Sequence, residues 1–388
     1  MFNFTALPPL SLYVHLPWCV RKCPYCDFNS HEVKDAVLPE QDYINALIAD
    51  LEQELPAIWG RPVETVFVGG GTPSLFSPDA VDRLVSQLRA LLALPATAEI
   101  TLEANPGTLE AGRFAEFRAA GINRLSIGIQ SFDDAMLGRL ERIHDARQAI
   151  AAAETARAAG FEEFNLDLMY GLPGQTGAQA VADLEQAIAL QPTHLSHYQL
   201  AIEPNTRFAH SPPVRPDDDE IGEMQSACQA RLAAAGFENY EVSAYARPGH
   251  HCRHNLNYWR FGDYLGIGAG AHGKLSSAQP QGIRRCAKLR HPRDYLARAA
   301  GAARIAEEHV LNPREAGFEF MLNALRLNEG FAVALFAQHT GLPLSTVETP
   351  LHTAESRGLI ERDMHTIRPT ALGRRFLNDL TALFLPGD

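Results

Sequence analysis

The segment at residues 13–30 decides the fold, and it reads YVHLPWCVRKCPYCDFNS. Its first part belongs to a short apolar run that predicts a β-strand at 12–16. A loop with three cysteines follows, because Cys19, Cys23 and Cys26 are spaced C-x3-C-x2-C. A local group of thiols in a large chain without a secretory signal indicates a metal site rather than disulfide bonds.

Two kinds of metal site fit three clustered thiols. A structural zinc ion is normally held by four protein ligands, and His15 or His31 beside the cysteines would complete such a set. An iron–sulfur cluster is held by cysteine thiolates, normally four. With only three thiolates, one iron keeps an open position at which a substrate or cofactor can bind. Both interpretations stay open on the cysteines alone.

The first half of the chain repeats one pattern, an apolar run followed by a helical stretch. This alternation predicts an α/β fold in which helices wrap a parallel sheet. A closed barrel of eight units needs about 250 residues, whereas six units fit residues 1–205, so we predict a partial (β/α)6 barrel. Ligands of such folds bind at the carboxyl ends of the strands. The further predicted strands lie at 65–69, 99–104, 124–129, 164–169 and 194–200, and the helices at 40–55, 78–93, 108–120, 134–140, 145–159 and 177–190.

We predict three domains. The barrel core spans 1–235 and ends with a helix that opens at the acidic run near 217–220. Residues 236–305 form an extension of mixed strands and loops, with a turn or loop at 276–282. Residues 306–388 form a C-terminal helical, winged-helix-like domain. Modules of this type often bind DNA, but the low basic content favours a cap or an interaction domain.

The charge and hydropathy of the chain exclude some classes of partner. The net charge is −12 and no long basic run occurs, whereas nucleic-acid binders usually carry a basic footprint. We therefore expect no nucleic acid as a main partner. No apolar run reaches about 18 residues, so we expect no membrane span. The N-terminus lacks the basic and long apolar segments of a secretory signal, which predicts a cytoplasmic location.

Glycine or polar residues follow the predicted strands, at the edge where ligands bind. Three glycines in VFVGGGTPS at 66–74 let the backbone approach a ligand closely. Carboxylates, an amide and a cation follow at the next strands. They suit a zwitterionic ligand with a ribose, because carboxylates accept hydrogen bonds from hydroxyl and ammonium groups and arginine pairs with carboxylate. The residues of this set are Gly70, Gly71, Thr72, Glu103, Gln130, Arg142 and Asp167.

The cysteine spacing after the first strand resembles the radical S-adenosylmethionine superfamily. The resemblance implies a 4Fe–4S cluster whose open iron binds the amino and carboxylate groups of S-adenosylmethionine. It implies that an electron donor serves the cluster, and that a 5′-deoxyadenosyl radical is formed. It places Tyr25 near the adenine and the glycine segment at the amino group. It also assigns Tyr13 to the cofactor, whereas the narrower resemblance described next places Ala201 and His272 in the region where the oxidases hold a second S-adenosylmethionine.

A narrower resemblance covers nearly the whole chain. It is to the oxygen-independent coproporphyrinogen III oxidase family, and it is carried by GGGTPS, EANPGT, GIQSF, RIHD and DLMYGLPGQT. The oxidases carry a further cysteine two residues after the third, where this chain has Phe28. The sequence therefore resembles the oxidase-like branch of haem chaperones. That branch carries an H-N-x-x-Y-W motif, which occurs here as HNLNYW at 254–259.

The resemblance implies that haem binds near HNLNYW. Histidine is a common axial ligand of haem iron, and we expect His254 to be the ligand. The other candidates are His250, His251 and Cys252 as ligands, and Tyr258 and Trp259 as an apolar wall for the porphyrin.

The preferred hypothesis is a haem chaperone that passes haem to acceptor haem proteins, using a 4Fe–4S cluster and S-adenosylmethionine. The alternative is an enzyme that decarboxylates the propionates of coproporphyrinogen III after hydrogen abstraction. Phe28 and HNLNYW argue against the alternative, and whether the chain is an enzyme stays open. A third hypothesis is a non-redox zinc module with a helical interaction domain. A product assay separates the first two hypotheses, and metal analysis separates the third.

Overall fold

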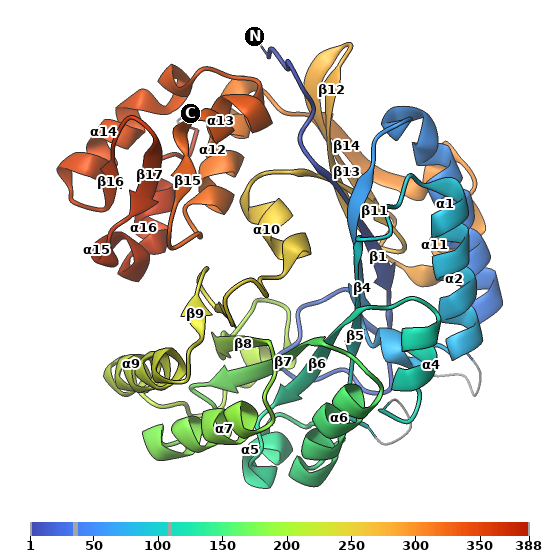
Figure 1. Ribbon diagram of the computed structural model, residues 1–388, viewed down its shortest axis with the longest axis vertical. Helices are drawn as coiled ribbons and strands as arrows, with labels where there is room; N and C mark the ends of the chain where they lie inside the picture. Colours follow the sequence, from blue (N-terminus) through green and yellow to red (C-terminus); the bar gives the residue numbers. More distant parts are fainter. Residues whose placement is uncertain (1, 34–37, 108–110, 387–388) are drawn as a thin grey trace.

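A curved sheet dominates the computed structural model, which describes residues 2–33, 38–107 and 111–386. In this part of the chain, twelve strands form one open sheet in the order β14-β13-β12-β11-β1-β4-β5-β6-β7-β8-β10-β9. Helices cover its outer face, and one short helix, α10, lies inside the curve (Figure 1). None of the described helices has the length and apolar composition that a membrane crossing requires.

The six predicted strands are confirmed, and they pair in parallel in chain order. Their apolar side chains alternate: Leu12 and Val14 of the first strand are fully buried against the outer helices, whereas Tyr13 between them faces the inside of the curve. The strands are β1 (Leu10–Leu16), β4 (Val63–Gly70), β5 (Glu99–Ala104), β6 (Arg124–Gln130), β7 (Glu163–Tyr170) and β8 (His194–Gln199).

Most of the outer helices begin at a residue whose side chain caps the helix. Ser77 caps α2 and Pro78 occupies its first turn, as the sequence predicts. Capping boxes open α6, α7 and α9 at Asp145, Thr176 and Asp217. The start of the helix predicted at 108–120 lies outside the described residues. The helices are α1 (Glu40–Ile58), α2 (Pro78–Leu91), α4 (Phe114–Ala119), α5 (Asp134–Arg139), α6 (Ala146–Ala158), α7 (Gly177–Ala189), α8 (Arg207–His210) and α9 (Asp218–Ala234).

The segment predicted as an extension, 236–305, adds strands to both edges of the sheet. β10 (Ala244–Ala246) pairs antiparallel with β8, and β9 (Glu238–Asn239) pairs antiparallel with β10 at the edge of the sheet. β11 (Asp263–Ile267) pairs in parallel with β1, so the edge that six units leave open is covered by a seventh parallel strand. The antiparallel strands β12 (His272–Ala278), β13 (Gln281–Lys288) and β14 (Ile305–Val310) follow.

Two details of the sequence prediction change in this segment. The turn or loop expected at 276–282 is confined to residues 279–280, because its flanks are the ends of the β12–β13 hairpin. The predicted boundary between residues 305 and 306 falls at the start of β14. The two domain boundaries therefore stay predictions, and the large sheet crosses both of them.

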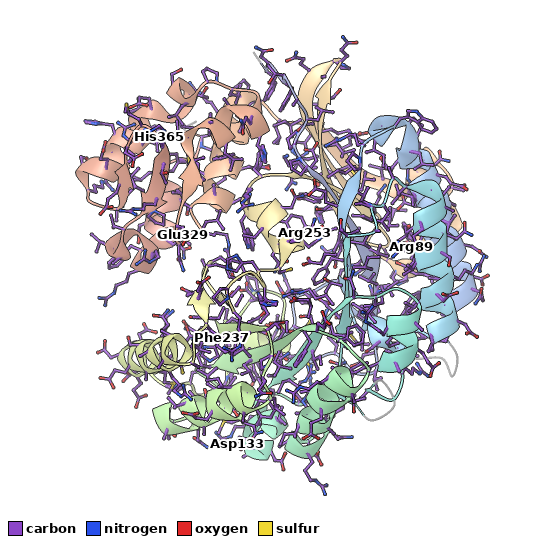
Figure 2. All side chains as sticks on the ribbon, viewed as in Figure 1. Arg89, Asp133, Phe237, Arg253, Glu329 and His365 are labelled. Atoms are coloured by element: carbon purple, nitrogen blue, oxygen red, sulfur yellow. The ribbon has the colours of Figure 1, made fainter. Side chains whose placement is uncertain are left out.

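The short helix α10 (Arg253–Trp259) contains HNLNYW and lies inside the curve of the sheet. The label of Arg253, its first residue, marks it in Figure 2. The carboxylate of Glu99 accepts hydrogen bonds from the backbone N–H groups of Arg253 and His254, at 3.1 and 2.9 Å. This is the favourable position for a carboxylate at a helix N-terminus. Asn257 Nδ2 donates to Ser11 Oγ at 2.8 Å and to the Asp263 carbonyl at 2.9 Å. α10 is therefore fastened to the amino ends of β5, β1 and β11.

The C-terminal part is mainly helical and has its own core, which includes Phe320, Phe336 and Leu351. A three-stranded sheet in the order β15-β17-β16 completes it within the described residues, as a winged-helix-like domain requires. The N-terminal Phe4 packs into the same core. The elements are α12 (Pro313–Ala324), β15 (Phe331–Ala332), α13 (Val333–Thr340), η3 (Leu344–Val347), α14 (Glu348–Ser356), β16 (Ile360–Arg362), β17 (Thr366–Pro369), α15 (Ala371–Arg375) and α16 (Leu377–Ala382).

A buried ionic network joins α1 to the added edge of the sheet. The ammonium group of Lys288 on β13 lies 2.7 Å from a carboxylate oxygen of Asp50 and 2.7 Å from one of Glu54. Arg304, in η2 (Ala302–Arg304), contacts the same two carboxylates at 2.7 Å. These four side chains are almost completely buried. α11 (Pro292–Arg298) lies between β13 and η2 in the chain.

Candidate functional site

The cysteine loop follows β1 and is fastened at both ends. β2 (Trp18–Cys19) pairs in parallel with β3 (His31–Glu32) and closes the loop. Asn29 Nδ2 donates to the carbonyls of Ala269 and Arg290, at 2.9 Å each. The sulfurs of the loop line one cavity of about 680 Å³ at the carboxyl ends of the central strands. The cysteines in this cavity are Cys19, Cys23 and Cys26.

The glycine segment after β4 packs directly against the cysteine loop. The Gly71 N–H donates to the Leu16 carbonyl at 2.8 Å, and the Thr72 N–H donates to the Trp18 carbonyl at 2.7 Å. A Cβ atom at Gly71 would lie 2.5 Å from the Trp18 oxygen, so no larger residue fits there without moving the loop. The short 3-10 helix η1 (Pro73–Leu75) follows. Position 71 thus requires glycine, because its backbone lies against the backbone of Trp18, the residue before Cys19.

The structure brings together the polar residues that follow the strands. Arg142 donates to Asn105 Oδ1 at 2.7 Å, to the Gly128 carbonyl at 2.8 Å and to Cys23 Sγ at 3.5 Å. Asn105 Nδ2 donates to Thr72 Oγ1 at 2.9 Å. Asn105 therefore links the glycine segment to Arg142. It was missed as a site residue, although it lies in the quoted motif EANPGT. The cavity also contains Tyr25, Gly70, Glu103, Gln130, Asp167 and Ala201.

Burial sets the protonation of the two carboxyl groups in the cavity. It raises the pKa of Glu103 to about 7, with a further contribution from the charge of Asp167, although the Gly70 N–H bonded to Glu103 opposes the shift. Burial also raises the pKa of Asp167, which accepts hydrogen bonds from Ser126 and Asn165. A ligand that brings a positive charge into this cavity would stabilise both carboxylates.

The donor set fits an iron–sulfur cluster. Burial raises the pKa of the Cys19 and Cys26 thiols, so their thiolate forms need a positive partner. Among the described residues, no three His, Cys, Asp or Glu side chains are grouped as ligands of one metal ion. The three sulfurs instead stand around a larger space, with Arg142 as a hydrogen-bond donor to Cys23. Soft thiolate ligands of this kind suit iron–sulfur clusters.

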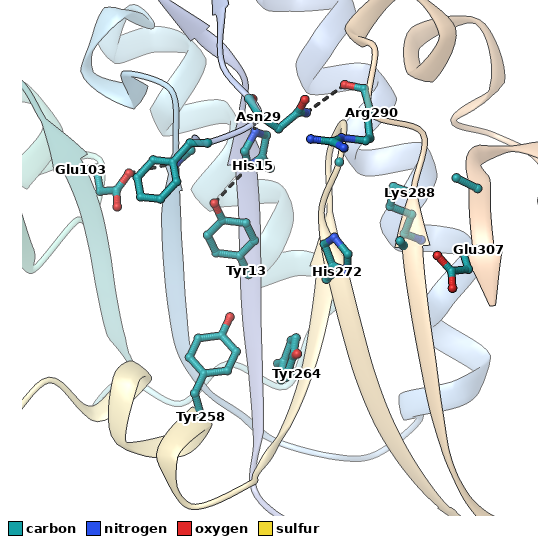
Figure 3. Close-up of a pocket in the computed structure, with 15 residues that line it drawn as sticks. Tyr13, His15, Asn29, Glu103, Tyr258, Tyr264, His272, Lys288, Arg290 and Glu307 are labelled. Atoms are coloured by element: carbon teal, nitrogen blue, oxygen red, sulfur yellow. Dashed lines mark hydrogen bonds between the residues drawn. The ribbon is translucent and has the colours of Figure 1, made fainter. Parts of the chain in front are cut away.

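A second cavity of about 660 Å³ adjoins the first and shares Phe28, Gly70 and Glu103 with it. It extends along the inner face of β1 towards α10, and Figure 3 shows Asn29 and His15 at one end and Tyr258 and Tyr264 at the other. The expected cofactor residues Tyr13 and His272 line this second cavity and do not line the cysteine cavity. The structure thus separates the residues expected at the cofactor into two groups.

His254, the expected haem ligand, lies in the protein interior with 1% of its surface exposed. Its Nδ1 hydrogen-bonds with Thr65 Oγ1 at 2.8 Å, and its Nε2 with the Tyr258 hydroxyl at 3.2 Å. Burial lowers its pKa to about 3, so the ring is neutral. In this conformation neither nitrogen is free for iron. Tyr258, by contrast, lines the second cavity.

The other candidates from this segment do not line either cavity. His250 Nδ1 is 2.5 Å from Glu163 Oε1, at the amino end of β7. The His251 ring lies against Tyr240 with centroids 4.3 Å apart. Cys252 is buried, with Sγ 3.6 Å from Glu99. Trp259 lies beneath the guanidinium group of Arg326, 4.3 Å from the ring centroid. HNLNYW and its flank therefore lie at the opposite ends of the strands from the cysteines.

Comparisons with known families and structures agree with this architecture. Residues 13–187 match the model of the Radical SAM superfamily, and residues 311–376 match that of the HemN C-terminal domain. The structure of coproporphyrinogen III oxidase (HemN) from Escherichia coli is similar, with a TM-score of 0.81 over 97% of this chain and 90% of that chain. Because the two sequences are only 24% identical, this similarity shows a shared fold and nothing more. Fold and cysteine cavity are those of the radical S-adenosylmethionine class, which implies a 4Fe–4S cluster and S-adenosylmethionine.

Two curated relatives narrow the assignment. The heme chaperone HemW of Escherichia coli (strain K12) is 49% identical over 98% of this chain and 99% of the relative. The heme chaperone HemW of Bacillus subtilis (strain 168) is 32% identical over 97% of this chain and 99% of the relative. The chain belongs to the family of these HemW proteins, which confirms the resemblance to the oxidase-like branch.

Proposed function

We propose that the chain is a haem chaperone, which binds haem in the cytoplasm and passes it to acceptor haem proteins. The observation that carries this proposal is the 49% identity to the Escherichia coli HemW over 98% of the chain. The residue at the position of the extra oxidase cysteine supports it, because Phe28 offers an exposed apolar ring to both cavities instead of a thiol.

Cys19, Cys23 and Cys26 would hold a 4Fe–4S cluster in the cysteine cavity, with S-adenosylmethionine beside it. Such a cluster, once reduced by an electron donor, would supply the electron for reductive cleavage of S-adenosylmethionine. Glu103 and Asp167 line this cavity and would accept hydrogen bonds from the ammonium and hydroxyl groups of the cofactor, and Thr72 would add a hydroxyl. The remaining candidates for cofactor contacts in this cavity are Tyr25, Gly70, Gly71, Gln130, Arg142 and Ala201.

The test is a titration of ferric haem into anaerobically reconstituted protein, followed by incubation with an apo-haem protein. We expect saturable binding of about one haem per chain and transfer of that haem to the acceptor. Iron and acid-labile sulfide should be present in near equal amounts, since a 4Fe–4S cluster has this composition. Zinc in place of iron would contradict the cluster.

Absence of saturable haem binding would overturn the proposal. In that case the assay to run next is decarboxylation of coproporphyrinogen III, because the solved oxidase has the same fold. Formation of product in that assay would establish the alternative enzyme function.

A further inference from the structure

The second cavity contains a histidine with a free imidazole. His272 begins β12, its side chain is exposed, and it lines the cavity (Figure 3). Its ring makes no hydrogen bond, ion pair or ring contact with any residue that the structure describes. The other histidine of this cavity, His15, has both nitrogens occupied, at 3.0 Å from the Tyr13 hydroxyl and 2.9 Å from the Asn29 carbonyl. His272 is thus the imidazole of this cavity whose lone pair can reach a ligand.

Three tyrosine rings form much of the cavity wall, namely Tyr13, Tyr258 and Tyr264. Their hydroxyl groups are held by protein side chains: Tyr13 by His15, Tyr258 by His254, and Tyr264 by Arg285. These bonds fix the rings. Flat, fixed aromatic rings are suited to contact a large planar ligand.

Phe28 adds an apolar ring at the boundary with the cysteine cavity. It is 60% exposed, an unusual state for phenylalanine, and it lines both cavities. A planar apolar ligand in the second cavity would cover part of this ring. The volume of about 660 Å³ lies within the range of sites for organic ligands.

The rim of the cavity carries one unpaired cation. Arg290 is exposed, and its guanidinium group has no hydrogen bond or ion pair with the described residues, although its carbonyl accepts a bond from Asn29. Lys288 also lines the cavity, but Asp50 and Glu54 neutralise its ammonium group. Arg290 is therefore the group that can pair with a carboxylate of a ligand at the rim.

We propose that the second cavity is the haem site, with His272 as the axial ligand of the iron and Arg290 as the partner of a propionate. His254 then acts as a positioning residue, because it holds the Tyr258 ring in the cavity wall. The proposal rests on the proposed function, since it locates the haem of the chaperone. It replaces His254 as ligand and moves His272 from the cofactor to the haem.

The first experiment measures ferric haem binding to the full-length, cluster-loaded protein by its absorption spectrum. We expect His272→Ala to lower the haem affinity at least tenfold and to change the Soret band. Free imidazole should restore the wild-type spectrum of this variant, because it can take the vacant ligand position. The control is His352→Ala, an exposed histidine on α14, which should bind haem like the wild type.

A second pair of variants tests the positioning role. His254→Gln and Tyr258→Phe should each weaken haem binding several-fold and leave the Soret band unchanged, since the iron ligand remains. A Soret change in His254→Gln that free imidazole reverses would identify His254 as the ligand and overturn the assignment. Arg290→Ala should weaken binding of haem but not of its dimethyl ester, which lacks propionate charges.

The outcomes separate this inference from the proposed function. If the wild type binds no haem, the chaperone function fails together with the site. If the wild type binds haem and His272→Ala binds it with the same affinity and spectrum, only the site fails. His272→Gln provides a second variant of similar polarity, and equal behaviour of both variants excludes an effect of folding.

Discussion

At the scale of single residues, Gly71 lies in close contact with the backbone of the cysteine loop. Gly71→Ala would bring a Cβ atom within 2.5 Å of the Trp18 oxygen, so the backbone before Cys19 must shift. We expect the variant to fold but to retain less than half of the wild-type iron after reconstitution, as iron analysis would measure. Gly138→Ala is the control, because a Cβ atom there meets nothing within 4 Å. Wild-type iron content in Gly71→Ala would contradict the required close approach.

We predict that Glu103 makes cofactor binding depend on pH. Its pKa is raised to about 7, so the carboxylate that we propose to pair with the ammonium group of the cofactor is mostly present above pH 7 and mostly lost below it. The affinity for S-adenosylmethionine should therefore fall about tenfold from pH 8 to pH 6, in proportion to the ionised fraction. Equilibrium binding checks this. Glu103→Gln should bind more weakly and show a flat profile over the same range; an equally steep profile would assign the titration to another group.

At the scale of elements, α10 depends on the carboxylate at its N-terminus. Glu99 accepts hydrogen bonds from two backbone N–H groups of α10. Glu99→Gln removes the charge and one acceptor, and we expect a loss of about 1–3 kcal/mol in the free energy of unfolding. Urea unfolding measures this loss. Glu64→Gln should change stability by less than about 0.5 kcal/mol, because Glu64 is an exposed residue 3.9 Å from Arg253. Equal losses in both variants would mean that Glu99 does not anchor α10.

The sequence predicts well those strands and helices whose apolar residues recur at a regular spacing. The central strands and outer helices follow from apolar runs such as the one around Leu12 and Val14, because their buried face is apolar. The position of α10 could not be predicted in this way. It packs on the inner face of the sheet through Ser11, Thr65 and Glu99, and these polar contacts leave no apolar pattern.

The candidate site, like the fold, was predicted only in part. Residues that follow strands in sequence, such as Gly71 and Arg142, meet in the cysteine cavity because parallel strands bring their carboxyl ends together. His272 and Tyr258 could not be assigned by this rule, since they flank β11, which pairs with β1 although the two strands are far apart in the sequence. His254 is of a residue type that can bind haem iron, but only its hydrogen bonds in the structure reveal that both ring nitrogens are occupied.

At the scale of the whole molecule, the buried network between α1 and β13 holds the added edge of the sheet. Glu54→Gln would leave Lys288 and Arg304 without part of their buried negative charge. We expect a loss of about 3–5 kcal/mol at pH 7, measured by urea unfolding. Glu52→Gln, on an exposed position of the same helix, should be neutral. A loss below about 1 kcal/mol would contradict this role.

The same network predicts sensitivity to acid. Burial alone would raise the pKa of Glu54, but Lys288 and Arg284 outweigh it and lower the pKa to about 2. Because the folded pKa lies below the ordinary value of about 4.5, the contribution of Glu54 is complete above pH 4.5 and is lost as the pH falls towards 2. The stability difference between wild type and Glu54→Gln should therefore shrink over this range. A constant difference would exclude Glu54 as its source.

The wall shared by the two cavities has a thermodynamic consequence. Phe28, Gly70 and Glu103 face both spaces, so a molecule in one space alters the surface that the other presents. Thermodynamic linkage requires such an influence to be equal in both directions. If bound haem changes the affinity for S-adenosylmethionine by some factor, bound S-adenosylmethionine changes the affinity for haem by the same factor. With haem in the second cavity as proposed, consumption of S-adenosylmethionine would therefore change the affinity with which the chain holds haem.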